Sequence, residues 1–491
     1  MNILLANMPI NFNKRENLEP PLGICYIAAN LKGVRGAEVR LKDYEVSPFS
    51  DADLERDLSI PGTDILGVSF RTASYRSAKE FIKKAREIKS GIFVVAGGHH
   101  ATAFPRETLL DLGCDAVVIG EGEHAFKELV QRMSGRLSLK GLAGIAYRDN
   151  DSNIIINDRR PPIEDIDSLP GPARELLDLD SYNVITILTS RGCPFNCIYC
   201  DKGISTRTVK YRSAESIFDE MRHIVRDLGK NKLYVVDDHF FLNKNRLEPV
   251  LDRIIKEKLP VSWVCQARVD GITEDILQKA KKAGCEQIMF GIETGDETEL
   301  AYIRKNATLE GALRAVELTK KAGITARANF MLGFPVSTKH TMRSTINFAA
   351  KLKPDIVRFF AVSPLPNTEL WDNIYGKGRI PEGIKWEEID FYRPSFDIKN
   401  VSREDVSLYV SAGYWRVLKI PFIKEITICL IPNMIKLCYL IFRTGKIRGN
   451  ISKAFPRSVN LIMDNLHQIH GKRPAEVAAF LGKVKNLERS L

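Results

Sequence analysis

The sequence predicts an α/β protein in which two parallel-sheet domains are followed by a helical C-terminal region. Short apolar runs alternate with helical patterns over residues 1–135, as in a parallel sheet with helices on both faces. A more regular alternation runs over residues 184–362 and stops near residue 390. Because the chain has 491 residues, it is too long for one ordinary hydrophobic core, and more than one domain is expected.

The first domain is expected at residues 1–140. Its alternation of short apolar runs and helical segments predicts an open, doubly wound sheet. The strands are predicted at residues 3–8, 65–70, 92–96 and 116–119, and two of the helices at residues 77–90 and 124–133.

Candidate ligand-binding residues follow these strands. In an open parallel sheet, ligands bind beyond the carboxyl ends of the strands, and glycines there allow a close approach of the backbone. No GxGxxG motif follows the first strand, which argues against a dinucleotide. Ordinary turn or surface roles are the alternative for these positions. The candidates are Ser69, Arg71, Gly97, Gly98, His99, Thr102, Glu121 and Gly122.

Residues 141–182 are predicted to form a linker. A hairpin is expected at residues 144–156, and prolines are dense after it. Because proline removes a backbone donor and fixes φ, such density argues against a regular core element.

A second domain is expected at residues 183–389. Its six strand and helix repeats, the last without a clear helix, fall short of the eight of a closed TIM barrel. The strands are predicted at residues 184–188, 232–236, 261–267, 287–291, 325–332 and 355–362, and the helices at 213–228, 245–258, 273–283, 309–322 and 339–352.

Three cysteines with CxxxCxxC spacing, Cys193, Cys197 and Cys200, follow the first strand of this domain. Thiolates on one short loop suit either zinc or an iron–sulfur cluster. Structural zinc is almost always held by four protein ligands, and the loop offers no fourth Cys or His. A cluster held by three cysteines leaves one iron open to a small molecule. A zinc site with a distant fourth ligand is the alternative.

The CxxxCxxC spacing, with the aromatic residue Tyr199 before the last cysteine, resembles the signature of radical S-adenosylmethionine (SAM) enzymes. The resemblance implies a [4Fe-4S] cluster whose open iron chelates SAM, and cleavage of SAM to a 5′-deoxyadenosyl radical. It also implies an open, partial (β/α)6 barrel of TIM type. The SAM contacts that it suggests are Tyr199 near the adenine, Glu293 at the ribose, Asp238 at the amino group, Arg327 at the carboxylate, and Arg268 at a neighbouring strand end.

The N-terminal domain resembles a known cofactor domain. Residues 20–29 (PPLGICYIAA), 97–102 (GGHHAT) and 120–123 (GEGE) are similar to the Rossmann-like (flavodoxin-like) cobalamin-binding domain that precedes the barrel in one class of radical SAM enzymes. The DxHxxG motif of some cobalamin proteins is absent, since residues 43–46 (DYEV) contain no histidine. The resemblance therefore implies cobalamin whose lower face has no histidine ligand.

The C-terminal region, residues 390–491, is expected to be helical. Residues 426–442 are strongly apolar but shorter than the ~20 residues of a spanning helix. Between residues 415 and 473 there are eleven Lys or Arg and two acidic residues, so the net charge of +11 is concentrated there. A helical cap, a lid over a hydrophobic substrate, and an interfacial segment on an anionic membrane all fit this pattern. Nucleic acid is not expected, because no RNA-binding module is present.

These features together predict a cytoplasmic enzyme. The chain opens without a basic stretch or cleavage site, and its nine cysteines are not spaced as a secreted disulfide framework,. We expect a cobalamin-dependent C-methyltransferase that acts on a hydrophobic or lipid-like metabolite and takes electrons from a flavodoxin-type or ferredoxin-type donor. One alternative is a radical SAM cyclase or rearrangement enzyme without methyl transfer. An alternative of another class is a non-enzymatic zinc-binding scaffold.

Overall fold

The computed structural model describes residues 1–10, 18–47, 49–59, 62–201, 204, 206–389, 391, 394–418, 483 and 486–487. The chain divides into two compact units. The division falls within strand β13 (Cys285–Glu293). The first unit comprises Met1–Phe290, Glu317–Thr325 and Pro364–Ile389, and the second Gly291–Val316, Ala326–Ser363 and Asp390–Leu491.

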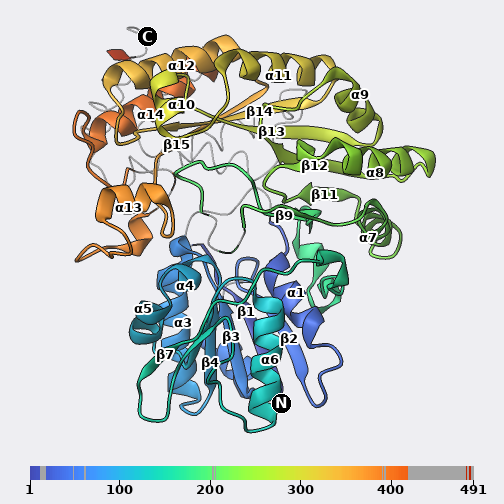
Figure 1. Ribbon diagram of the computed structural model, residues 1–491, viewed down its shortest axis with the longest axis vertical. Coiled ribbons are helices and arrows are strands. Elements are labelled where there is room, and N and C mark those ends of the chain that lie inside the picture. Colours follow the sequence, from blue (N-terminus) through green and yellow to red (C-terminus); the bar gives the residue numbers. More distant parts are fainter. Residues whose placement is uncertain are drawn as a thin grey trace, which may run out of the picture. The chain divides into compact units, whose positions relative to one another are not determined.

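The N-terminal sheet has seven strands in the order β2-β1-β3-β4-β5-β6-β7 (Figure 1). The first five of these are parallel to one another, and β6 and β7 are antiparallel. The 2-1-3-4-5 order is that of a flavodoxin-like sheet, which confirms the predicted class of fold. The strands are β1 (Asn2–Asn7), β2 (Glu38–Asp43), β3 (Ile65–Ser69), β4 (Phe93–Gly97), β5 (Ala116–Val118), β6 (Ile145–Arg148) and β7 (Ile154–Ile156).

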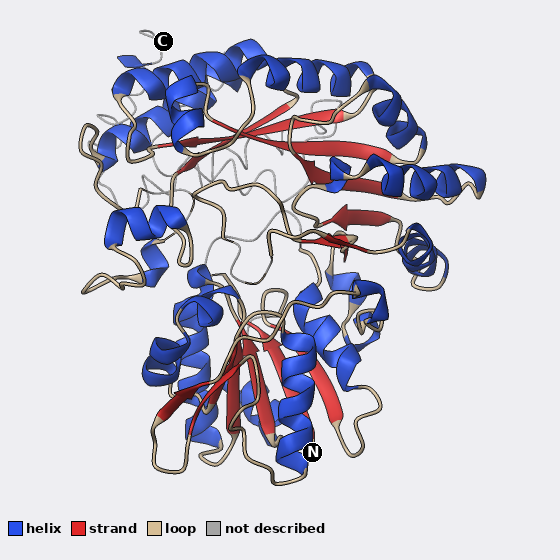
Figure 2. Ribbon diagram, in the orientation of Figure 1, coloured by secondary structure: helices blue, strands red, loops and turns tan. Residues whose placement is uncertain are grey.

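Helices cover both faces of this sheet, as Figure 2 shows. Ile3 and Leu5 pack in one core with α1 (Leu22–Leu31) and α6 (Gly122–Ser134). Leu4 and Ala6 point the other way, because side chains alternate along a strand. They pack in the core that contains α2 (Asp51–Ser59), α3 (Tyr75–Ile88) and α5 (Pro105–Leu112), near the short helix α4 (His99–Ala103).

Two features of this sheet differ from the sequence expectation. Strand β2 was not predicted, because its sequence EVRLKD is mostly polar. It lies at the edge of the sheet. The side chains of Glu38, Arg40 and Lys42 stay at least partly accessible to water, whereas Leu41 on the other face is buried. The predicted hairpin forms as β6 and β7, but β6 pairs with β5 and so extends the sheet. The remaining segment up to residue 182 contains three short 3₁₀ helices, Ile166–Ser168, Arg174–Leu176 and Leu179–Ser181.

The second sheet has six strands in the order β8-β11-β12-β13-β14-β15, which is the predicted partial barrel. In the first unit β8, β11, β12 and β13 are parallel neighbours, and in the second β14 and β15 are. The strands besides β13 are β8 (Ile185–Ile187), β11 (Lys232–Val235), β12 (Ser262–Ala267), β14 (Thr325–Leu332) and β15 (Ile356–Ala361). The helices are α7 (Ala214–Arg226), α8 (Lys244–Lys256), α9 (Glu274–Lys282), α10 (Glu297–Tyr302), α11 (Leu309–Lys321) and α12 (Lys339–Leu352).

The sixth barrel helix, which the sequence left uncertain, is α14 (Arg403–Leu418). It packs beside β15, where the Tyr414 hydroxyl accepts a hydrogen bond from Phe359 N at 3.0 Å and donates one to Phe359 O at 3.1 Å. The repeat therefore resumes after residue 390, following a long excursion of the chain.

That excursion, residues 364–389, returns to the N-terminal sheet, and we call it the strap. It contains α13 (Glu369–Tyr375) and the 3₁₀ helix Trp386–Glu388. Trp371 and Trp386 stack with their ring centroids 5.8 Å apart and join the core of α2, α3 and α5. The strap is thus part of the N-terminal hydrophobic core.

The apolar segment 426–442 lies outside the part of the chain that the structure describes. Among the described helices, none is long and apolar enough to cross a membrane.

Candidate active site

The loop that carries the three cysteines is closed at its base by a pair of short strands. We call residues 191–201 the cluster loop. β9 (Ser190–Arg191), which leads into the cysteines, pairs antiparallel with β10 (Lys210–Tyr211), which follows them in the chain. Gly192 adopts a φ of 95°, and a Cβ there would lie 2.6 Å from Thr208 O. Only glycine fits this entry to the cluster loop, because the position combines a left-handed conformation with a close backbone contact.

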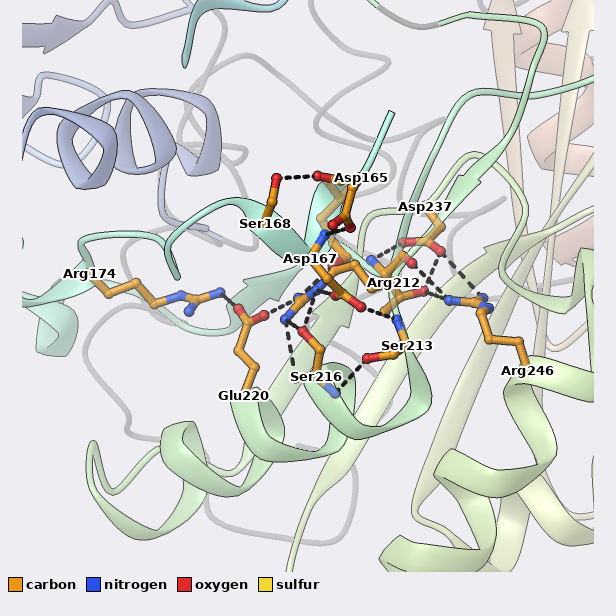
Figure 3. Close-up of polar contacts among 12 residues, drawn as sticks. Asp165, Asp167, Ser168, Arg174, Arg212, Ser213, Ser216, Glu220, Asp237 and Arg246 are labelled. Carbon is orange, nitrogen blue, oxygen red and sulfur yellow. Dashed lines mark hydrogen bonds and ion pairs between the residues drawn. The ribbon is translucent and has the colours of Figure 1, made fainter. Parts of the chain in front are cut away.

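A fully buried carboxylate holds the residues before the cluster loop. Asp237 follows β11 and accepts hydrogen bonds from Thr189 N at 2.6 Å, from the Thr189 hydroxyl and from the Ser190 hydroxyl. Arg246 on α8 donates to Thr189 O at 2.8 Å, and its Nη2 atom lies 3.9 Å from Asp237 Oδ2 (Figure 3). Burial lowers the pKa of Arg246, and Asp237 acts in the opposite direction. Sequence reasoning selected the neighbour Asp238, which is exposed, and missed this role of Asp237.

An adjoining ion network fixes the strand that leads to the cluster loop. Glu220 on α7 pairs with both Arg174 and Arg212 (Figure 3). Arg174 also donates to Thr186 O at 2.6 Å, and Arg212 donates to Leu188 O at 2.9 Å. All three charged side chains are at most 9% exposed. The carboxyl end of β8 is therefore tied to the helix that follows the cluster loop.

The cysteines are half-buried in the cluster loop. Arg268, which follows β12, places its Nη1 atom 3.9 Å from Cys197 Sγ, and its guanidinium lies 3.6 Å from the ring centre of Phe195. Among the described residues, no group of three or more His, Cys, Asp or Glu side chains is arranged to hold a metal ion. The donor chemistry of the cluster loop nevertheless fits an iron–sulfur cluster, because three thiols lie on one loop beside a cationic guanidinium.

The carboxyl edge of the N-terminal sheet carries the other predicted residues. Ser69 ends β3 and Gly97 ends β4, and the two residues are partners in the parallel ladder. Gly98 has a φ of 99°, and a Cβ there would collide with the carbonyl oxygen of Phe70. The Thr102 hydroxyl accepts a hydrogen bond from Gly120 N at 3.1 Å. The structure thus brings the loops after β3, β4 and β5 together at one edge.

The fit of cobalamin at this edge rests on the open backbone of these loops. Gly97, Gly98 and Gly120 leave the strand ends without side chains, so a large planar ligand can approach the backbone. Gly122 serves a different purpose, since a Cβ there would lie 2.9 Å from the Ile27 side chain. It allows α6 to pack closely on α1. Arg71 is exposed at the same edge.

The two adjacent histidines have different surroundings. His99 is 45% exposed, and its Nδ1 atom lies 2.8 Å from the Asp201 carboxylate. His100 is buried, and its ring centre lies 4.7 Å from that of Tyr75 and 4.5 Å from that of Trp386 on the strap. Burial lowers the pKa of His100 to about 3. His100 is therefore a neutral core residue rather than a ligand.

In the second unit, Glu293 ends β13 and stands out by its backbone. Its φ is 72°, a conformation that costs a non-glycine residue energy and is concentrated at functional sites. Its carboxylate pairs with the buried Lys305 at 2.8 Å. Arg327 lies on β14, where its Nε atom donates to Asn329 Oδ1 at 3.2 Å.

A buried carboxylate that sequence reasoning missed supports this strand end. Glu299 is 1% exposed and accepts hydrogen bonds from the hydroxyls of Thr294, Ser337 and Thr341. Thr294 directly follows Glu293, so this network helps to fix the strained residue. Glu299 lies on α10, and its sequence context gives no signal beyond that of an ordinary helix.

Comparison with known proteins identifies the family. The radical SAM superfamily matches residues 187–349, and the B12 binding domain matches residues 8–130. An uncharacterized methyltransferase of Pyrococcus horikoshii is 32% identical over 402 residues, which cover 80% of this chain and 87% of the relative. The chain belongs to the cobalamin-binding radical SAM enzymes.

This membership confirms the predicted cofactors, since a radical SAM enzyme with a B12-binding domain uses a [4Fe-4S] cluster, SAM and cobalamin. It also sets aside the non-enzymatic zinc scaffold. An anaerobic magnesium-protoporphyrin IX monomethyl ester cyclase of Rubrivivax gelatinosus is 26% identical, covering 83% of this chain and 76% of that relative. The structure of the cobalamin-dependent SAM radical enzyme OxsB superposes with a TM-score of 0.71 at 16% identity, covering 100% of this chain and 79% of OxsB. This last likeness shows the fold.

Proposed function

We propose that this radical SAM enzyme is a C-methyltransferase that acts on an unactivated carbon of a hydrophobic small molecule. The 32% identical relative is named a methyltransferase, and the N-terminal domain supplies a site for a methyl carrier. The observation that supports the proposal most is the direct contact between the cluster loop and the loops at the carboxyl edge of the N-terminal sheet, through Arg191 and Asp201. A radical source and a methyl carrier must both reach one substrate.

The bound cofactors supply the difficult chemistry, which is reductive cleavage of SAM and transfer of a methyl group. The protein supplies the ligands and the positions. Cys193, Cys197 and Cys200 would hold the cluster, and Gly97, Gly98 and the neighbouring loops would hold the corrin. Tyr199, Asp238, Arg268, Glu293 and Arg327 remain our predicted SAM contacts.

Two of these SAM contacts have further support from the structure. Arg268 lies 3.9 Å from Cys197 Sγ, so a cationic guanidinium lies next to a cysteine that we expect to hold the cluster, and Arg327 remains the predicted contact of the SAM carboxylate. Glu293 has the strained backbone expected of a residue that is held for function,. Its carboxylate, with Lys305 on one oxygen, keeps acceptor capacity for a ribose diol, because a carboxylate has about four lone-pair sites.

The hydrophobic nature of the substrate is supported by the sequence of residues 426–442 and the basic residues around it. We expect the protein to float with anionic liposomes at low salt, since apolar and basic residues together favour an anionic interface. Full recovery in the soluble fraction would contradict the membrane contact. We also propose an electron donor of the flavodoxin or ferredoxin type.

The methyl-transfer proposal is tested with SAM that carries a labelled methyl group. We expect one labelled methyl in the product for each 5′-deoxyadenosine formed. The second candidate, a radical cyclase, is favoured by the 26% identical relative of that name. A product with an unchanged carbon count and no label would refute methyl transfer and support the cyclase.

A further inference from the structure

The cluster loop contacts the N-terminal domain on both sides of the cysteine motif. Arg191 stands two residues before Cys193, and Asp201 directly follows Cys200. Arg191 reaches the loop after β5, and Asp201 reaches the residue that begins α4 after β4. These are the strand ends where we predict that the corrin binds.

The guanidinium of Arg191 donates hydrogen bonds to two carboxylates. Its Nη1 atom donates to Glu121 Oε1 at 2.9 Å, and its Nη2 atom donates to Glu123 Oε1 at 2.5 Å. The side chains of Arg191, Glu121 and Glu123 are 15%, 12% and 6% exposed. Because the guanidinium is a rigid planar fork, two bonds to two carboxylates fix its orientation as well as its position.

The receiving carboxylates are themselves held in place. Glu121 Oε2 accepts a hydrogen bond from Ile163 N at 2.6 Å, and the Arg191 guanidinium also lies 5.4 Å from the ring centre of Tyr26 on α1. Glu121 and Glu123 flank Gly122, the first residue of α6. The guanidinium is therefore held by two segments of the N-terminal domain, at Tyr26 and at residues 121–123, and the second of these is itself held by Ile163.

Such an ion triad, mostly buried but still partly open to water, is a poor way to gain stability alone. Removing charges from water costs about as much as their attraction returns, and apolar side chains would serve as well. In some proteins, though not in all, such groups instead fix one register between two elements, and the two-carboxylate geometry of Arg191 suits that role. The second contact, between His99 Nδ1 and Asp201 Oδ2 at 2.8 Å, restrains the opposite side of the same loop.

We propose that Arg191 is a positioning residue that fixes the cluster loop against the cobalamin-binding loops through Glu121 and Glu123. The inference rests on the proposed function. Arg191 sets the separation and orientation between the site of radical formation and the methyl carrier. Radical formation and methyl transfer then stay matched, one to one. The His99 contact with Asp201 is the second and weaker point of the same attachment.

The test compares Arg191→Gln and Arg191→Lys with the unchanged protein. The matched control is Arg160→Gln, which breaks the contact of Arg160 with Glu128 on α6, a partly exposed pair in the same unit whose side chains are 27% and 35% exposed. A first measurement, hydrogen exchange of residues 190–201 in the full chain without cofactors, is independent of any activity. We expect exchange roughly tenfold faster in Arg191→Gln, because local opening becomes easier, and no change in the control.

The second measurement uses the loaded enzyme. We expect iron and cobalamin contents to stay at the unchanged protein's values, and the magnetic interaction between the reduced cluster and cob(II)alamin to weaken in the paramagnetic resonance spectrum. We also expect more 5′-deoxyadenosine per methylated product. Arg191→Lys keeps the charge but can contact only one carboxylate at a time. Its magnetic interaction and its product ratio should therefore lie between those of the unchanged protein and those of Arg191→Gln.

Each outcome decides the proposal. Unchanged exchange, magnetic interaction and product ratio in Arg191→Gln would overturn it, and so would an equal effect in the Arg160→Gln control. If Arg191→Gln does not fold, Glu123→Gln, which keeps the contact with Glu121, is measured in its place. If the unchanged enzyme transfers no methyl group, the proposed function fails, while exchange and the magnetic interaction still decide the role of Arg191.

Discussion

The cluster loop is supported by the barrel on one side and by the N-terminal domain on the other, and the two supports differ in burial. On the barrel side Asp237 is fully buried, and the Arg246 side chain is 8% exposed. On the N-terminal side the Arg191 side chain is 15% exposed, and that of His99 is 45% exposed. The first support is sealed from water, whereas the second is partly open to it.

This difference separates two tasks. A sealed network of hydrogen bonds gives a loop one conformation, because each buried group left without a partner is costly. Partly exposed contacts hold more weakly, since water competes for the same atoms. The contacts on the barrel side should therefore determine whether the cluster loop folds. The contacts on the N-terminal side should determine where the folded loop lies relative to the predicted cobalamin.

The largest effect is expected from the loop's own sulfurs. Replacement of Cys193, Cys197 or Cys200 by alanine should remove the cluster and abolish turnover, because the cluster would lose one of its three protein ligands. Iron analysis and 5′-deoxyadenosine formation check this. Cys114→Ala, at a buried cysteine of the N-terminal domain, is the control and should keep its iron. Turnover that survives all three replacements would refute the radical mechanism.

The next effect separates two adjacent carboxylates. Asp237→Asn should destabilise the first unit by about 3–5 kcal/mol, because it leaves Arg246 buried with less compensation. Asp238→Asn should change stability by less than ~0.5 kcal/mol, since Asp238 is exposed,, but should raise the KM for SAM. Denaturant unfolding and SAM titration check the pair. Equal losses of stability would contradict the role we give to Asp237.

A smaller effect is expected at Glu293. Glu293→Gln should raise the KM for SAM by roughly 10- to 150-fold, because one charge-assisted hydrogen bond is worth about 1.5–3 kcal/mol. The iron content should not change, since Glu293 is not among the predicted ligands. The exposed Glu310 on α11 supplies the control variant Glu310→Gln. An unchanged KM in Glu293→Gln would remove Glu293 from the SAM site.

The smallest effect concerns pH and the core beneath the N-terminal loops. Burial lowers the pKa of His100 to about 3, and Asp111 on α5 acts in the opposite direction. The unfolded chain, with a histidine pKa near ~6.5, binds a proton that the folded chain rejects. Stability should therefore fall as the pH falls below ~6.5, by up to about 1.4 kcal/mol per pH unit.

The variant His100→Gln removes this linkage. It should be less stable at neutral pH, because it disturbs the packing around Tyr75 and Trp386, but its thermal unfolding should depend less on pH between 6.5 and 4.5. The exposed His340 provides the control His340→Gln. An unchanged pH slope in His100→Gln would mean that His100 is protonated or solvated in the folded protein.

Much of the architecture could be predicted from local pattern. Strand β1, which is buried on both faces, has a continuous apolar run, and β14, which is buried on one face, has an alternating one. The positions of both strands followed from the sequence. The edge strand β2 did not, because its EVRLKD sequence is mostly polar and a polar strand resembles a loop. The strap was missed for another reason. Its tryptophans have partners more than two hundred residues away, and no local pattern records such a contact.

The candidate site shows the same limit at the scale of single residues. The cysteine spacing lies within one loop, so it could be read directly. The choice between Asp237 and Asp238 could not, because adjacent residues on a strand end point to different surroundings and only the packing separates them. Arg191 lies about seventy residues after Glu121 and Glu123 in the sequence, so no local pattern shows that their side chains form ion pairs once both loops have folded.

The strap also affects how the protein is made. Trp371, Trp386 and Ile389 belong to the core under the N-terminal helices, so a ribosome must translate almost four-fifths of the chain before that core can be completed. Until then, apolar surface beside α3 and α5 stays open to water and to chaperones. Expression of the N-terminal domain alone should yield an aggregation-prone fragment, whereas supplying residues 364–389 as a separate peptide should restore its solubility.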